Sequence, residues 1–150
     1  MSNLVNISVD GYENGDIYGR IYTAYSIQST LFTGIVSLLF EMERFYDRLG
    51  FPMAATEHRR FNGKNTEREE MIVIDRENPI KHSGEKASFI VLVRFRQNSS
   101  WQGTMRWLEK GKEVPFRSAL ELIRLIDSSC LNAMHGEGNR ENMIGYDYPE

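Results

Sequence analysis

The sequence has 150 residues and a formal net charge of -3, and 41% of its residues are hydrophobic. This length and composition indicate a single globular domain and exclude a disordered chain. The weak negative charge provides no overall attraction to nucleic acid or an anionic membrane, so such a contact would need a local basic patch. We expect no leader, because the sequence does not open on a charged-then-apolar segment. No apolar run reaches the length of a membrane span, and the lone cysteine, Cys130, excludes an internal disulfide. We therefore expect a soluble, cytoplasmic protein.

The chain is predicted to begin with a β-hairpin. Residues 5–9 alternate between apolar and polar side chains, with the period of two that is typical of a strand with one buried face. Residues 17–25 provide the second strand. Asn14 and Gly15 lie between the two strands, and they favour a tight hairpin turn because both residue types tolerate positive φ.

A helix is predicted to follow this hairpin over residues 31–49, with Ser29 or Thr30 as its N-cap. Gly50 and Pro52 then end the helix in the expected order. The apolar stripe of the helix is broad, which is typical of a core-facing element rather than a site. The stripe consists of Ile35, Leu38, Leu39, Met42, Phe45, Tyr46 and Leu49.

The middle and the end of the chain are less regular. Residues 53–70 show no clear period, residues 71–75 predict a short strand, and residues 80–86 form a polar connector. Residues 135–150 combine glycine, asparagine and acidic residues, which predicts a loosely held tail. We expect residues 1–134 to form the folded domain.

The second half repeats the pattern of the first. Residues 89–96 alternate as a strand, residues 101–108 form a strand rich in aromatic and polar residues, and residues 110–112 suit an exposed loop. A helix is predicted from about Phe116, or from as late as Ser118, because Ser118 and Glu121 match a capping box. Its core-facing stripe consists of Phe116, Ala119, Leu122, Ile123, Ile126 and Cys130.

These elements predict an α+β fold with two ββα units, in which the hairpins form one antiparallel sheet covered by two helices. Sliding the sequence by 84 positions brings the apolar patterns of the two units into register. This shift places Val5, Ile7, Val9, Gly19 and Phe32 on Phe89, Val91, Val93, Gly103 and Phe116. The units are therefore a possible internal repeat, with the two glycines in equivalent hairpins and the two phenylalanines opening equivalent helices. The alternative is that any two such units align once their turns are matched.

No catalytic constellation is visible in the sequence. His58, His82 and His135 all lie in predicted loops without the spacing of metal ligands. Cys130 lies on an apolar stripe, which is typical of a small core residue rather than a nucleophile. No glycine-rich loop between a strand and a helix offers a phosphate cradle. We therefore predict a non-enzymatic protein with no metal, cofactor or catalytic residue.

The candidate binding site is the second hairpin, where arginines and aromatic residues gather on adjacent strands. Such side chains can anchor a protein partner, or stack on bases and bind phosphates. The alternative is that the aromatics pack into the core while the arginines form surface ion pairs. The candidate residues are Arg94, Arg96, Gln97, Asn98, Trp101, Gln102 and Arg106. A second candidate patch on the irregular middle segment consists of Arg59, Arg60, Lys64 and Arg68.

Residues 98–103, Asn-Ser-Ser-Trp-Gln-Gly, fit the pattern Asp/Asn-x-Ser-x-x-Gly. This pattern resembles the second motif of PilZ domains, which bind cyclic di-GMP on a small β-barrel. The first motif of that family, Arg-x-x-x-Arg, is expected shortly upstream in an N-terminal arm. Here Arg60 to Lys64 only approximates it, and Arg44 to Arg48 falls inside the predicted first helix. The resemblance implies, as an alternative function, a nucleotide or nucleic-acid binding module that uses the hairpin between Arg94 and Trp107.

Residues 101–104 and 116–127 also resemble a group of small bacterial proteins without assigned function, some of which are carried on mobile elements. The resemblance covers mainly the C-terminal half and brings no catalytic residues with it. Small mobile-element proteins often bind and block a larger host machine. The resemblance therefore implies an inhibitor or adaptor with a protein partner, with no membrane contact and with its oligomeric state left open.

Overall fold

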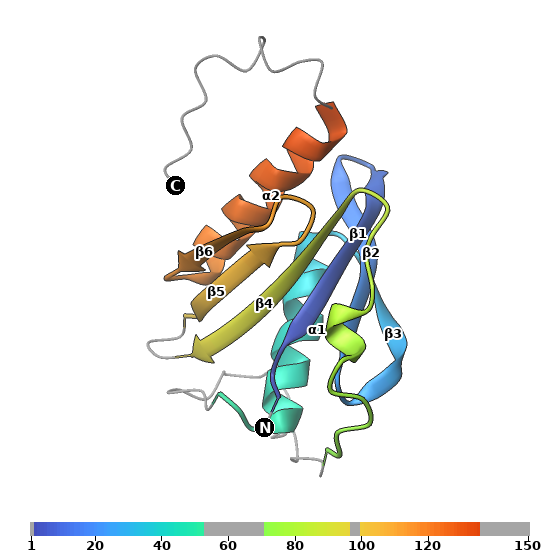
Figure 1. Ribbon diagram of the computed structural model, residues 1–150. Coiled ribbons are helices and arrows are strands. Elements are labelled where there is room, and N and C mark those ends of the chain that lie inside the picture. The colour runs from blue at the N-terminus through green and yellow to red at the C-terminus, as the bar shows by residue number, and fades with distance from the viewer. Residues whose placement is uncertain (1, 53–70, 97–99, 136–150) are drawn as a thin grey trace.

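A computed structural model describes residues 2–52, 71–96 and 100–135 (Figure 1). The described residues form an α+β fold, as the sequence predicts, with six antiparallel strands in the order β3-β2-β1-β4-β5-β6. In chain order, the elements are β1 (Val5–Glu13), β2 (Asp16–Thr23), β3 (Ser26–Thr33), α1 (Ile35–Leu49), the short 3₁₀ helix η1 (Asn78–Ile80), β4 (Ala87–Phe95), β5 (Gln102–Trp107), β6 (Lys112–Phe116) and α2 (Ala119–His135).

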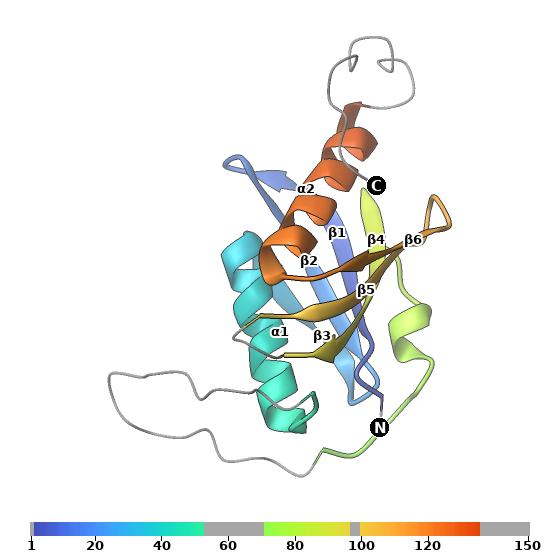
Figure 2. The same cartoon turned by 90° about the vertical axis from the view of Figure 1, so that its left-hand side faces the viewer.

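Both α-helices pack on one face of the sheet, which we call the helix face (Figure 2). Helix α1 contacts β2 and β3, whereas α2 contacts β4, β5 and β6. The core lies between these layers, and the alternating residues of β1 and β4 that point into it are completely buried. These residues are Val5, Ile7, Val9, Phe89, Val91 and Val93, as the alternation in the sequence predicts.

The opposite, outer face of the sheet is covered in its centre by the segment around η1 (Figure 2). Buried Asn6 on β1 donates its side-chain amide to the carbonyl oxygens of Pro79 and His82, at 2.7 and 2.9 Å. The His82 ring stacks on Tyr22, with 3.7 Å between the ring centroids. His82 therefore holds this segment against the sheet.

The predicted turn of the first hairpin is confirmed. Asn14 and Gly15 have φ angles of 54° and 79°, which lie in the left-handed region. Two successive residues of this kind match the right-handed twist of the flanking strands. The turn is thus a local property of the two residue types at its tip.

Each half of the sheet contains a third strand that the sequence pattern did not predict. Residues 26–33 form β3, so the helix begins at Ile35 and not at Leu31. Residues 112–116 form β6, where a loop and the start of a helix were expected. Phe32 and Phe116 do not open helices, because each lies in the C-terminal part of a third strand with its side chain buried in the core. The two units are therefore βββα rather than ββα.

The helix N-termini are capped by different residues. Ser118 behaves as predicted, since its hydroxyl oxygen accepts a hydrogen bond from the Glu121 N–H at 3.1 Å. For α1, the expected cap at Ser29 or Thr30 is wrong, because both residues lie within β3. The carboxylate of Asp16 instead accepts the Ile35 N–H, at 3.1 Å. A side chain from the first hairpin thus satisfies a free donor of the helix end.

The predicted strand at residues 71–75 is not formed. The N–H groups of Ile74 and Asp75 both donate to the carbonyl oxygen of Ala24, in the turn between β2 and β3, at 2.8 and 3.0 Å. The irregular segment at residues 53–70 and the tail at residues 136–150 lie outside the described residues. Among the helices that the structure describes, none has both the length and the apolar character needed to cross a membrane.

The strand pairings of the first unit recur 84 residues later in the second. Gly19 pairs with Val9 on one side and Phe32 on the other, and Gly103 pairs in the same way with Val93 and Phe116. The two central strands pair with each other, Val5 with Val91 and Ile7 with Phe89. Val5 and Ile7 correspond to Phe89 and Val91 at the shift of 84, so exchanging the two strands converts one of these pairs into the other. The pairing between β1 and β4 is therefore the one expected for two units related by an approximate two-fold axis.

The packing of α2 gives a direct stability test. Leu122 is completely buried, whereas Leu120 on the same helix is 56% exposed. We expect Leu122→Ala to lower the free energy of unfolding by about 2 to 5 kcal/mol through loss of burial and creation of a cavity. Leu120→Ala should change it by less than about 0.5 kcal/mol. Urea denaturation measures both values, and equal effects would contradict the assignment of the buried face.

Candidate functional site

Two of the predicted site residues, Arg96 and Trp101, lie in the interior and not on the surface. Arg96 is 5% exposed, and its guanidinium donates to the Asp47 carboxylate at 2.8 Å and to the Pro52 carbonyl oxygen at 2.7 Å. Trp101 is 8% exposed and packs edge-on against the Tyr46 ring, with centroids 5.7 Å apart. Neither residue is therefore exposed to a partner. Trp101 packs into the core, as the alternative expects, whereas the ion pair of Arg96 is buried and not on the surface.

The cause is a β-bulge between Val93 and Phe95, where β4 gains one residue relative to β5. Without it, Arg94 and Arg96 would lie on the same face of the strand. An extra residue shifts the alternation by one, so Arg96 turns to the helix face while Arg94 stays exposed. Because of the bulge, Arg96 has a structural role in the interior, whereas Arg94 remains on the surface.

Arg96 is held by an aromatic side chain as well as by charge. Its guanidinium carbon lies 5.7 Å from the centroid of the Tyr46 ring. Burial raises the pKa of the Tyr46 hydroxyl far above its usual value, and the positive charge of Arg96 opposes that rise. Arg96, Asp47, Tyr46 and Trp101 form one interlocked group, which ties the end of α1 to the second hairpin.

The other predicted residues of the hairpin that the structure describes lie on or beside a patch on the outer face of the sheet. The strand register places three rows of side chains there, one each on β4, β5 and β6, beyond the area covered by η1 (Figure 2). The β4 row is apolar, and its last member, Phe95, is 52% exposed. We call this patch the β4–β6 face; it consists of Ile90, Leu92, Phe95, Gln102, Thr104, Arg106, Glu113 and Pro115.

Charge on the β4–β6 face is concentrated at its margins. Exposed Arg106 lies between Ile90 and Glu113 in the strand register, and Gln102 lies opposite Phe95. Arg94, the extra residue of the bulge, is exposed beside Phe95. An apolar row flanked by arginines is a composition that suits an interface with an acidic partner.

Several predicted site residues cannot be placed. Gln97 and Asn98 lie outside the described residues, and so does the whole second candidate patch. That patch consists of Arg59, Arg60, Lys64 and Arg68. The surface members of the predicted site within the described residues are therefore Arg94, Gln102 and Arg106.

Cys130 lies in the core, as predicted for a small apolar residue. Burial, with a smaller effect from Asp127, raises the pKa of its thiol to about 12. The thiol is thus protonated at neutral pH, which makes it a poor nucleophile. Across residues 2–52, 71–96 and 100–135, no group of three His, Cys, Asp or Glu side chains could hold a metal ion.

The apolar row of the β4–β6 face was missed at the level of sequence. The strict alternation of the strand places Phe95 on the same face as the buried Val93. That prediction is wrong, because the bulge turns Phe95 to the outer face with Ile90 and Leu92. An available signal was the absence of a third helix that could cover a second sheet face. No family model, curated protein or solved structure matches the chain.

Proposed function

We propose that this chain is a non-enzymatic binding protein that contacts a protein partner through the β4–β6 face. The observation that carries the proposal is the apolar row on the outer side of β4, in which Ile90 and Leu92 are half-buried and the ring of Phe95 is 52% exposed. Apolar side chains gathered on one open sheet face mark an interaction surface more often than scattered ones do. Arg94 and Arg106 at the margin favour a partner with acidic groups.

A protein partner is favoured over nucleic acid by the composition of this face. Single-stranded nucleic acid is bound on aromatic stacking platforms within a basic groove. Phe95 is the one aromatic ring on the β4–β6 face, and Glu113 on β6 adds a negative charge beside Arg106. The net charge of -3 adds no general attraction to phosphate. These features suit a mixed apolar and polar protein interface.

We also propose that the bound partner is a larger host protein, with this chain acting as an inhibitor or adaptor encoded on a mobile element. This part of the proposal is supported by the resemblance of residues 101–104 and 116–127 to small bacterial proteins of that kind. A chain with this role needs a surface for its target and no catalytic centre. The β4–β6 face meets that requirement.

The test compares two variants with similar chemistry at different places. Phe95→Asp puts a charge in the β4–β6 face, and we expect it to weaken partner binding at least about 30-fold, as for the loss of an interface anchor worth about 2 kcal/mol. Leu31→Asp is the matched control, because Leu31 is 72% exposed on β3, at the other edge of the sheet. Partners captured from the native host by wild type and by both variants are identified and quantified by mass spectrometry.

A partner lost with Phe95→Asp and kept with Leu31→Asp supports the proposal. A partner retained by Phe95→Asp would contradict it. Binding is also measured between 50 and 200 mM salt, a range over which nucleic-acid binding falls by orders of magnitude. A comparably steep, log-linear loss would replace the protein partner with nucleic acid.

We further propose that the two βββα units form an internal repeat. Supporting this, the pairings of Gly19 and Gly103 match at a constant shift of 84, and α1 and α2 begin at Ile35 and Ala119, which are separated by the same shift. The bulges after Val9 and Val93 also correspond. In such a repeat, positions 84 residues apart are equivalent.

A further inference from the structure

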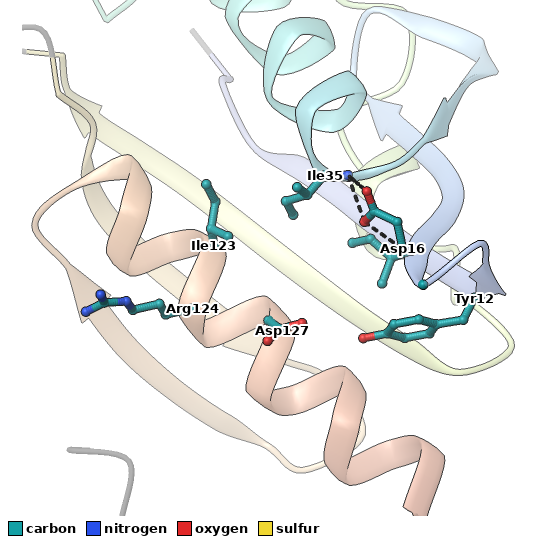
Figure 3. A pocket seen from close by; sticks show the side chains of 8 residues that line it. Tyr12, Asp16, Ile35, Ile123, Arg124 and Asp127 are labelled. Carbon is teal, nitrogen blue, oxygen red and sulfur yellow. Dashed lines mark hydrogen bonds between the residues drawn. The ribbon is translucent and has the colours of Figure 1, made fainter.

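A pocket of about 130 Å³ lies on the helix face, between the first hairpin and the N-terminal parts of both helices (Figure 3). Its apolar wall is formed by Ile17, Ile35 and Ile123. Its polar wall is formed by Tyr12, Asp16 and Asp127, with the stem of Arg124 at the edge. In Figure 3 the Tyr12 hydroxyl is directed toward Asp127, whereas the Arg124 guanidinium points away.

The buried Tyr12 hydroxyl forms no hydrogen bond within the described part of the chain. Four buried side-chain atoms find no hydrogen-bond partner within the described part of the chain, and among them the Tyr12 hydroxyl belongs to a residue lining this pocket. A buried polar group without a partner costs free energy that a suitable ligand would recover. Asp16 differs, since its carboxylate already accepts the N–H groups of Ile17 and Ile35.

The equivalent place in the second unit is filled. Positions 84 residues from Tyr12 and Ile17 are Arg96 and Trp101, and the position 84 residues before Cys130 is Tyr46. Arg96, Trp101 and Tyr46 pack together there, and Arg96 is paired with Asp47. Ile17, which lines the pocket, and Cys130, which is buried in the core, stand at the positions that two large aromatic side chains occupy in the other site. The pocket is therefore the space that smaller residues leave at one of two equivalent sites.

A difference in sequence between the two sites also explains why the Tyr12 hydroxyl has no polar partner. Position 131, equivalent to Asp47, is leucine, so Tyr12 lacks the carboxylate that Arg96 has. Burial raises the pKa of Tyr12 to about 12, with smaller contributions from Cys130, Asp127 and Asp16. Tyr12 is therefore a neutral phenol at pH 7, and the carboxylates of Asp127 and Asp16 lie close enough to influence it.

We infer that this pocket binds a small organic ammonium compound, with its apolar chain against the three isoleucines and its ammonium group between the Tyr12 hydroxyl and the Asp127 carboxylate. The ammonium group donates to both oxygens, so it supplies the partner that Tyr12 lacks and a counter-charge for Asp127. A carboxylate ligand would instead meet two acidic side chains. An apolar cavity of about 150 Å³ holds a molecule the size of benzene, so a chain of about four carbons suits this pocket.

The probe is n-butylammonium chloride, titrated into ¹⁵N-labelled protein at pH 7 while the amide signals of Gly15, Ile17 and Ile35 are followed. We expect saturable shifts at these three amides. 1-Butanol, the uncharged analogue, should bind about tenfold more weakly, because it lacks the charge-assisted hydrogen bonds. Butyrate, the anionic analogue, should leave these signals unchanged.

Two variants test the assignment of the pocket. Tyr12→Phe keeps the ring and removes the hydroxyl, and we expect it to weaken butylammonium binding about tenfold. Ile17→Trp introduces the residue that fills the equivalent site, and it should abolish binding. Tyr18→Phe is the control, because Tyr18 is a half-exposed tyrosine that lies outside the pocket, and it should bind as wild type does.

Equal affinity for butylammonium and butyrate would overturn the inference, and so would unchanged affinity in Tyr12→Phe. If Ile17→Trp fails to fold, the conservative Tyr12→Phe variant still decides the question. The pocket lies on the helix face and the proposed protein contact on the outer face, so the two proposals can fail independently. Loss of partner capture in Phe95→Asp says nothing about butylammonium binding.

Discussion

Replacing Arg96 with alanine is expected to lower the free energy of unfolding by about 3 kcal/mol, because it removes one member of a buried ion pair. Arg96, the residue after β4, is 5% exposed; it contacts α1 through the Asp47 carboxylate and the segment after α1 through the Pro52 carbonyl oxygen. The replacement removes the ion pair with Asp47 and the hydrogen bond to Pro52, and it also removes the guanidinium from the Tyr46 ring. The Asp47 side chain is 22% exposed and so can regain some water, which places the expected cost at the lower end of the known range.

Arg94→Ala is the matched control for this variant. Arg94 lies two residues earlier on the same strand and is exposed, so its replacement should change stability by less than about 0.5 kcal/mol. Urea denaturation followed by tryptophan fluorescence measures both effects, and Trp101 beside Tyr46 reports on this region directly. Similar midpoints for Arg96→Ala and Arg94→Ala would show that Arg96 is not held in the interior.

Replacing Gly103 with alanine is expected to lower the free energy of unfolding by at least about 3 kcal/mol. In the interior of a strand, alanine is normally more stable than glycine by about 0.5 to 1 kcal/mol, so this expectation runs against the usual preference. A Cβ atom at this position would overlap the backbone carbonyl oxygen of Leu92 on the neighbouring strand. Backbone cannot rotate away as a side chain can, so β4 and β5 would have to separate locally. The steric cost therefore outweighs the gain in backbone propensity.

Gly19→Ala is the companion variant, because its Cβ would overlap the Ser8 carbonyl oxygen in the same way. If the two units are equivalent, both variants should be destabilised to a similar extent, within about 1 kcal/mol. Gly15→Ala is the control: a Cβ there meets no atom within 4 Å, and its φ of 79° alone should cost about 1 to 2 kcal/mol. A thermal or urea midpoint near that of wild type for Gly103→Ala would contradict the described register.

Local pattern in the sequence was sufficient for much of the fold. The period of two in Val5, Ile7 and Val9 predicts a strand with a buried face, and these three residues are completely buried. The turn at Asn14 and Gly15 follows from residue types that tolerate positive φ. These features depend on neighbours within a few residues, so they can be predicted without knowing the rest of the chain.

The third strands could not be predicted in this way. The segment at residues 26–33 has short polar residues that resemble a helix cap and apolar residues that resemble a helix start. What makes it a strand is its pairing with β2, where Phe32 lies opposite Gly19 and is buried beneath α1. Such pairing is a tertiary contact, and it overrides a weak local preference.

The sequence alone determined the α+β class, the two hairpins and the buried stripes of both helices, because each depends on periodicity or on turn chemistry within a short window. Tertiary structure decided which hairpin residues are available for binding. A bulge between Val93 and Phe95 turns Arg96 inward to meet Asp47, a residue 49 positions away in the chain, and leaves Arg94 and Phe95 outside. Neither the bulge nor that distant ion pair has a local signal, since both arise only when strands and helices pack together.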